Sequence, residues 1–201
     1  MTDHELTGSR RDALALGAGV GLSAMVGAFA HANAAESAKA SGDEFAKSPP
    51  ATAVAGGPLV SGNYELAYQE NFAQGLRMAG FPEEAIMSAM LEASPRMSFK
   101  VDGDTLLGGA SLIGAQKIDL GAKRKVTILG VTVDDYVTYF DRPDRMITTF
   151  TAPNKMRVWS VRRFNERGAI NTTTFGDDTK FVSTRVWRRL PERQGIEGLT
   201  F

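Results

Sequence analysis

The sequence predicts an all-β domain, a closed antiparallel up-and-down barrel of about ten strands, with two short helices after the first strand. Three observations support this. Turn signals recur about every ten residues from Asp102 onward, as in meanders, sandwiches and barrels. Before them, the apolar spacing changes from that of a strand to that of a helix. A meander this long must hide its edges, and closure into a barrel does so.

The first 34 residues predict an export signal. Arg10-Arg11 precede the apolar stretch Ala13 to Ala30, and Ala32-Asn33-Ala34 offers small residues to a signal peptidase. The paired arginines resemble the bacterial twin-arginine class, although Ala13 stands where a bulky apolar residue is preferred. We therefore expect a periplasmic or secreted protein after removal of residues 1–34. Retention as a membrane anchor is the alternative, which the Gly- and Ala-rich composition disfavours.

Residues 35–58 predict a disordered linker. They combine small and polar residues with Ser48-Pro49-Pro50 and Gly56-Gly57-Pro58. Such a segment cannot bury enough surface to offset the entropy of ordering. The folded domain is therefore expected over residues 59–201.

One strand and two helices open this domain. Residues 61–69 alternate loosely, as a strand does. Residues 71–79 place Phe72 and Leu76 at helical spacing, with Asn71 as a possible N-cap. Pro82 suits the first position of a second helix, which Ser94-Pro95 ends.

Short strands separated by turns make up the rest. Asp102-Gly103 is a strong hairpin signal, and Gly108-Gly109 predicts a bend or bulge. Turn residues also mark off the later strands. The predicted strands are 97–101, 105–113, 123–129, 131–133, 136–140, 146–151, 156–164, 169–175 and 181–189.

Six segments in order along the chain carry a family resemblance: Gly62 to Leu66, Asn71-Phe72, Met97 to Thr105, Gly130 to Asp135, Val161 to Phe164 and Val182 to Trp187. Together they resemble the fatty-acid-binding proteins, a calycin family. The resemblance spans about residues 61–190. It implies a ten-stranded barrel in which the two helices form a lid, and a carrier that binds a fatty acid or similar hydrophobic acid without catalysis.

The resemblance also implies where the ligand binds. In that family the ligand carboxylate meets two arginines and a tyrosine inside the barrel. Arg162 and Arg185 stand at the matching positions, and Trp187 replaces the tyrosine. Ser183 shares the face of Arg185 by strand alternation, and the helix residues Phe72 and Leu76 complete the expected ligand contacts. Alternatively these arginines are solvated, or Arg163 takes the inward place of Arg162.

The composition excludes or disfavours several other classes of function. The chain has no cysteine, and its two histidines, His4 and His31, lie in the predicted export signal. The mature chain therefore lacks the parts of a Ser-His-Asp triad and the commonest haem and transition-metal ligands, so we expect no cofactor and no metal. Zero formal net charge gives no support for nucleic-acid binding.

Two other functions stay open. One is a periplasmic calycin-barrel isomerase, cyclase or hydrolase that uses Asp or Lys with a tyrosine. The other is an interaction module with a filled core. The carrier hypothesis expects a monomer that touches membranes transiently to transfer its ligand. The candidate tyrosines of the enzyme are Tyr64, Tyr68, Tyr136 and Tyr139.

Overall fold

A computed structural model describes residues 54–110, 114–177 and 181–191. The predicted export signal and most of the predicted linker lie outside these residues, so both stay predictions. Residues 54–58 of that linker are described. Val54 packs against the core, and the Gly57 amide donates a hydrogen bond to the Pro143 carbonyl at 2.7 Å. Packing in the described chain thus begins before Leu59.

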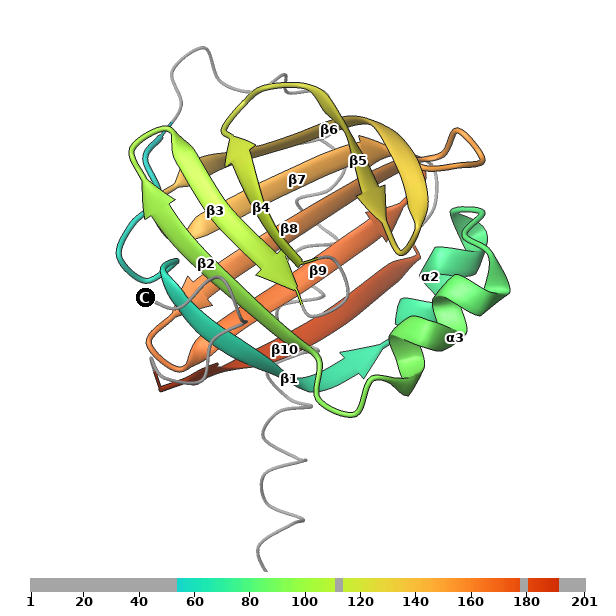
Figure 1. Ribbon diagram of the computed structural model, residues 1–201, viewed down its shortest axis with the longest axis horizontal. Coiled ribbons are helices and arrows are strands. Elements are labelled where there is room, and N and C mark those ends of the chain that lie inside the picture. The colour runs from blue at the N-terminus through green and yellow to red at the C-terminus, as the bar shows by residue number, and fades with distance from the viewer. Residues whose placement is uncertain (1–53, 111–113, 178–180, 192–201) are drawn as a thin grey trace, which may run out of the picture.

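Ten antiparallel strands form one curled sheet (Figure 1). Each strand pairs with its neighbours along the chain, including β1 with β2 across the two helices, except that β4 and β5 do not pair. In addition, β1 pairs with β10. The all-β class and the up-and-down order are therefore confirmed. The strands are β1 (Gly62–Glu70), β2 (Arg96–Asp102), β3 (Thr105–Ala110), β4 (Gly114–Asp119), β5 (Arg124–Ile128), β6 (Val131–Arg142), β7 (Arg145–Thr151), β8 (Arg157–Asn165), β9 (Gly168–Phe175) and β10 (Val182–Leu190).

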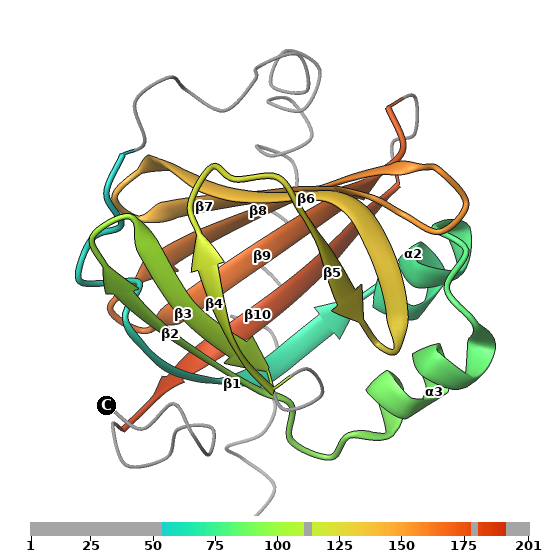
Figure 2. The ribbon, with the colours of Figure 1, turned by 45° about the horizontal axis from the view of Figure 1, so that its top comes forward.

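The sheet has two ends, β4 and β5, which face each other across its curl (Figure 2). In the described residues no backbone ladder joins them, so the sheet is not shown to close into the full barrel that we predicted. One side chain reaches across. The Arg124 guanidinium on β5 donates to the Lys117 carbonyl on β4 at 2.8 Å.

Two parts of the sheet differ from the prediction. Residues 131–142 form the single strand β6, not two strands. Asp134-Asp135 reads as a turn in the sequence, but the pair lies at a register shift of β6, where Asp135 has a φ of 50°. An extra residue in a strand is accommodated in this way as a bulge.

The second difference concerns β3 and β4. Gly108-Gly109 does not bend the chain, because β3 pairs in continuous register with β2 and β4. Gly108 instead leaves room for an aromatic ring, since a Cβ there would lie 2.9 Å from the Phe99 side chain. Strand β4 was not predicted.

The two helices are α2 (Phe72–Met78) and α3 (Glu83–Leu91), and they stand at one end of the curled sheet (Figures 1 and 2). Asn71 is the N-cap of α2, but its amide donates to the Val182 carbonyl of β10 instead of capping the helix. Pro82 is the N-cap of α3, one position before the predicted one. Among the described helices, none is long and apolar enough to cross a membrane.

Gly75 lets α2 lie directly on the sheet. A Cβ at this position would come within 2.2 Å of the Phe175 ring on β9. The absence of a side chain therefore sets how closely the helix approaches the strands. Glycine in the middle of a helix costs about 1 kcal/mol relative to alanine, and this contact explains why it stands here.

Gly75→Ala should destabilise the protein. The overpacking cost is typically 1–3 kcal/mol and exceeds the gain in helix propensity, so the free energy of unfolding should fall by roughly 1–2 kcal/mol. Urea denaturation measures the change. Adding Phe175→Leu should restore part of the loss. A Gly75→Ala protein more stable than the wild type would contradict the close contact.

Two apolar clusters form the interior. The lower cluster, which lies away from the helices, contains Tyr64, Phe99, Phe164 and Trp187. The ring centroids of Tyr64, Phe99 and Phe164 lie 5.8–6.3 Å from one another. The upper cluster joins the helices to the sheet through residues such as Phe175. A cavity separates these clusters.

The N-terminal end of the described chain is fastened at the lower cluster, away from the helices (Figure 2). The Arg189 guanidinium donates to the Ser61 carbonyl and to the Tyr64 hydroxyl, each at 3.0 Å, and also to the Leu59 carbonyl. The Tyr64 hydroxyl in turn donates to the Leu59 carbonyl at 2.8 Å. Arg189 thus ties the entering chain to the last strand.

Candidate ligand-binding cavity

The cavity lies inside the curl of the sheet, between the helices and the lower cluster. Its volume is about 210 Å³. Phe72, Leu76 and Phe81 line it from the helical segment, and strands β6 to β10 form its far wall. Ligand pockets typically have volumes of roughly 300–1,000 Å³, so the hollow is small but is not the filled core that an interaction module requires.

The far wall is built in layers, because directly opposed residues of antiparallel strands point to the same face. The register gives four layers, ordered from the helices downward. They are the apolar layer Phe150, Val158 and Phe175; the hydroxyl layer Thr148, Ser160, Thr173 and Ser183; the arginine layer Met146, Arg162, Asn171 and Arg185; and the floor Phe164, Ala169 and Trp187.

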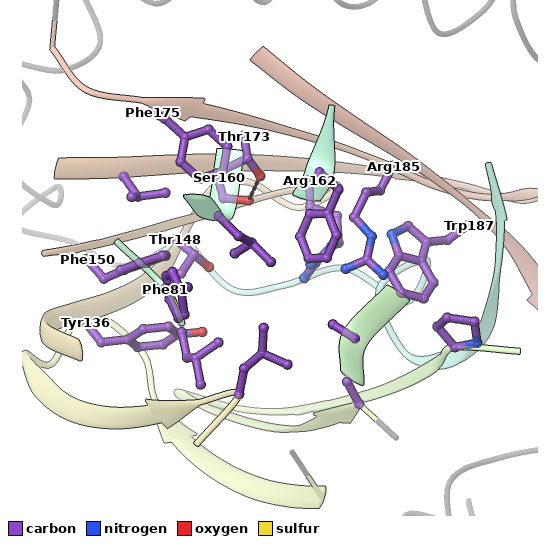
Figure 3. A pocket seen from close by; sticks show the side chains of 18 of the residues that line it. Phe81, Tyr136, Thr148, Phe150, Ser160, Arg162, Thr173, Phe175, Arg185 and Trp187 are labelled. Atoms are coloured by element: carbon purple, nitrogen blue, oxygen red, sulfur yellow. Dashed lines mark hydrogen bonds between the residues drawn. The ribbon is translucent and has the colours of Figure 1, made fainter. Parts of the chain in front are cut away.

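Arg185 is held between two aromatic rings. The carbon at the centre of its guanidinium lies 4.1 Å from the Phe72 ring centroid and 4.5 Å from the Trp187 ring centroid. Figure 3 shows Arg185 beside Trp187. Cation–π contacts of this kind contribute about 0.5–2 kcal/mol each. The rings offset part of the cost of burying the charge, but a guanidinium binds hydrogen-bond acceptors through its N–H groups, which the rings do not use.

Arg162 lies on β8 in the same layer. The central carbon of its guanidinium is 5.1 Å from the Phe99 ring centroid of the lower cluster. Figure 3 shows Arg162 and Arg185 as neighbours on the cavity wall. The neighbouring Arg163 is absent from the lining, so the register resolves which of these two arginines faces inward.

Burial lowers the pKa of both guanidinium groups. The pKa of Arg162 falls to about 10, and nearby Tyr136 and Tyr64 oppose the fall. The pKa of Arg185 falls to about 9 through burial and then through the positive charge of Arg162, against the opposing charge of Glu92. Both values lie above neutrality, so the cavity wall carries two positive charges at pH 7.

Three buried donors at this point have no hydrogen-bond partner among the described residues. They are the Nε atoms of Arg162 and Arg185 and the indole nitrogen of Trp187. Buried polar groups are usually hydrogen-bonded, and an unpaired one costs about 1–3 kcal/mol. All three are N–H groups, and two of them belong to charged guanidinium groups, so they suit a ligand that offers hydrogen-bond acceptors and negative charge.

Five of the six predicted ligand contacts line the cavity. They are Phe72, Leu76, Arg162, Arg185 and Trp187. Ser183 does not line it, because its buried hydroxyl donates to the Glu70 carbonyl on β1 at 3.0 Å. Contact of these five residues with a ligand stays a prediction.

The sequence analysis missed several lining residues of the far wall, among them Thr148, Ser160 and Thr173. Strand alternation counted back from Arg162 would have found Ser160. Thr148 and Thr173 join it only through the pairing of β7 and β9 with β8. That pairing carries no local sequence signal.

The tyrosines give little support to the enzyme alternative, which needs an inward tyrosine with a lowered pKa. Burial raises the pKa of Tyr64 to about 12, although the positive charges of Arg189 and Arg162 act to lower it. Burial, and after it the neighbouring Glu70 carboxylate, raises the pKa of Tyr68. Tyr136 lines the cavity and stacks on Phe150, with ring centroids 6.2 Å apart. Tyr139 belongs to a separate apolar cluster. In the described ranges no three carboxylate or histidine side chains gather as metal ligands.

Comparison with known proteins relates the fold to solved structures. No protein-family model matches the sequence, and no curated protein matches it. A Schistosoma mansoni fatty acid binding protein in complex with arachidonic acid is similar in structure, with a TM-score of 0.58 and 20% identity over 67% of this chain and 98% of its own. The Manduca sexta fatty-acid-binding protein gives 0.56 and 19%, over 65% and 98%. A fatty acid-binding protein from Drosophila melanogaster brain gives 0.53 and 21%, over 65% and 98%. At these identities the comparison shows the fold.

Proposed function

We propose that this protein binds a fatty acid or a similar hydrophobic acid inside the cavity, without catalysis, and that Arg162 and Arg185 pair with the carboxylate. One observation carries the proposal. Two guanidinium groups stand at the wall of a largely apolar hollow, and their Nε donors lack partners among the described residues. The similar structures of fatty-acid-binding proteins support this choice of ligand.

Charge is the first argument. A buried charge is costly unless it is paired and hydrogen-bonded. The described carboxylate that lines the cavity is that of Glu92, on the connection between α3 and β2. A carboxylate bound between Arg162 and Arg185 would neutralise part of the positive charge and accept their free N–H groups.

Geometry is the second argument. Phe72 and Trp187 cover the guanidinium of Arg185 with their rings, so they favour contact with an acceptor that lies at its edge. Carboxylates bind arginine in that plane, through two parallel hydrogen bonds. The Trp187 indole supplies a further donor beside them, in place of the tyrosine hydroxyl expected from the family.

The third argument is the apolar surroundings. Leu76, Phe81, Phe150, Val158 and Phe175 line the cavity on the side of the helices. Burying a hydrocarbon chain against them yields about 25 cal/mol per Å² of apolar surface. The hydrocarbon therefore extends from the arginine layer toward the helices, past the hydroxyl layer.

Binding of dodecanoate and of methyl dodecanoate tests the proposal. The full-length protein should bind the acid with at least tenfold higher affinity than the ester, because the ester cannot form the charged pair. Isothermal titration calorimetry gives both affinities. Trp187 provides a second signal, since its fluorescence should change on binding, while Trp159 on the separate cluster should respond little. Equal affinities for acid and ester would refute the arginine pairing, and no binding of either would refute the carrier function.

A further inference from the structure

The hydroxyl layer lies immediately next to the arginine layer. Thr148, Ser160 and Thr173 face the cavity from β7, β8 and β9, and they are direct partners across these strands. Ser160 and Arg162 are two residues apart on β8, which corresponds to roughly 7 Å along a strand. A carboxylate does not need this second polar layer, and a simple hydrocarbon chain would have to pass it.

Hydrogen bonds join two of these hydroxyls to Asn171 in a closed ring. The Ser160 hydroxyl donates to the Asn171 side-chain oxygen at 2.8 Å, and the Asn171 side-chain nitrogen donates to the Thr173 hydroxyl at 3.3 Å. The hydroxyl oxygens of Ser160 and Thr173 are 3.1 Å apart (Figure 3). Ser160 has one proton, which Asn171 receives, so Thr173 must be the donor to Ser160.

The ring determines what this layer can recognise. Both hydroxyl protons are used inside the ring, and turning the Asn171 amide over would only reverse the direction of the three bonds. Each hydroxyl oxygen accepts one bond in the ring and keeps one further lone pair. Ser160 and Thr173, which line the cavity, therefore offer acceptors to a ligand.

We propose that the preferred ligand is an acid with a hydroxyl group on one of its first few carbons, and that this hydroxyl donates to Ser160 or Thr173. The inference rests on the proposed function, because the arginine layer fixes where the acid group lies. A methylene group at this depth would leave the spare lone pair of each hydroxyl oxygen unused or bonded to a trapped water. A ligand hydroxyl satisfies one of them, and the apolar layer beyond receives the chain.

Three ligands test the inference on the unmodified full-length protein. They are dodecanoate, 3-hydroxydodecanoate and 3-methoxydodecanoate. The hydroxy acid should bind roughly five- to tenfold more tightly than dodecanoate, as one net hydrogen bond implies. The methoxy acid places an oxygen at the same carbon without a proton, so it should bind no better than dodecanoate.

The double variant Ser160→Ala/Thr173→Val removes the acceptors. It should lose the preference for the hydroxy acid, so that the ratio of the affinities for 3-hydroxydodecanoate and dodecanoate falls to about one. Thr149→Val is the control, because Thr149 is opposite Trp159 on the other face of the sheet. Equal binding of all three acids by the wild type would overturn the hydroxyl inference and leave the carrier function standing. A gain for the methoxy acid as well would overturn the assigned direction of the hydrogen bond. Failure of all three to bind would reject the carrier function itself.

Discussion

Replacing Arg185 with methionine should weaken binding of dodecanoate roughly ten- to hundredfold, because a hydrogen bond to a charged group contributes about 1.5–3 kcal/mol. Methionine keeps much of the side-chain volume and removes the charge. The affinity for methyl dodecanoate should change less than threefold. Calorimetric titration of both ligands at pH 7 makes the comparison.

Arg188→Met is the matched control on the same strand. Arg188 is exposed and bonds to Glu65 outside the cavity, so its loss should leave both affinities unchanged. Equal loss of acid and ester binding in Arg185→Met would mean that the variant has damaged the cavity. An unchanged affinity for the acid would remove Arg185 from the headgroup site.

A lysine at the same position should make binding depend on pH. Burial beside Arg162 brings the pKa of Arg185 down to about 9. Lysine begins from a lower pKa than arginine, and the same burial and neighbouring charge would lower its pKa further, toward neutrality. Arg185→Lys should bind dodecanoate more tightly at pH 6 than at pH 8, because the ammonium loses its proton as the pH rises. The wild type should bind equally at both values.

The ligand-free Arg185→Met protein should be more stable than the wild type. Without a bound anion the wild type holds two like charges near each other in an apolar interior, and replacing a buried ionic group by an apolar one often stabilises by about 1–4 kcal/mol. Its Tm should therefore rise by several degrees. Differential scanning calorimetry of ligand-free protein measures the effect.

Saturating dodecanoate should reduce the stability advantage of the variant. A ligand at a hundred times its Kd adds about 2.7 kcal/mol to the stability of the wild type, and the variant should gain much less at the same concentration. Arg188→Met should follow the wild type in both conditions. A lower Tm for ligand-free Arg185→Met would show that stacking on Phe72 and Trp187 outweighs the cost of burying the charge.

The sequence predicts the order of elements well, because glycine, proline and aspartate mark most turns. It predicts the strands less well. The segment 114–119 contains Gly114 and one large apolar residue, Ile118, so the end strand β4 carries little pattern of its own. Asp134-Asp135 suggests a turn, but in the structure the pair lies at a bulge. These two errors cancel, and the correct number of strands is partly fortuitous.

For the cavity, the sequence predicts only which residues share a face within a single strand. Alternation along β10 places Arg185 and Trp187 on one face, and both line the cavity. The ring of Ser160, Asn171 and Thr173 needs the pairing of β8 with β9, since its members belong to two strands. Only three-dimensional register joins them, which is why the sequence predicts an acid site but no second polar layer.

The position of the two ends of the described chain, one of them held by Arg189, determines where a tether can be attached to the protein. The described chain begins at Val54 and ends at Pro191, and both ends emerge at the pole opposite α2 and α3 (Figures 1 and 2). A surface, fluorophore or fusion partner attached at either end therefore leaves the helical pole facing open solvent. Under the proposed function, protein immobilised in this way would meet its ligand with the helical pole unobstructed by the tether.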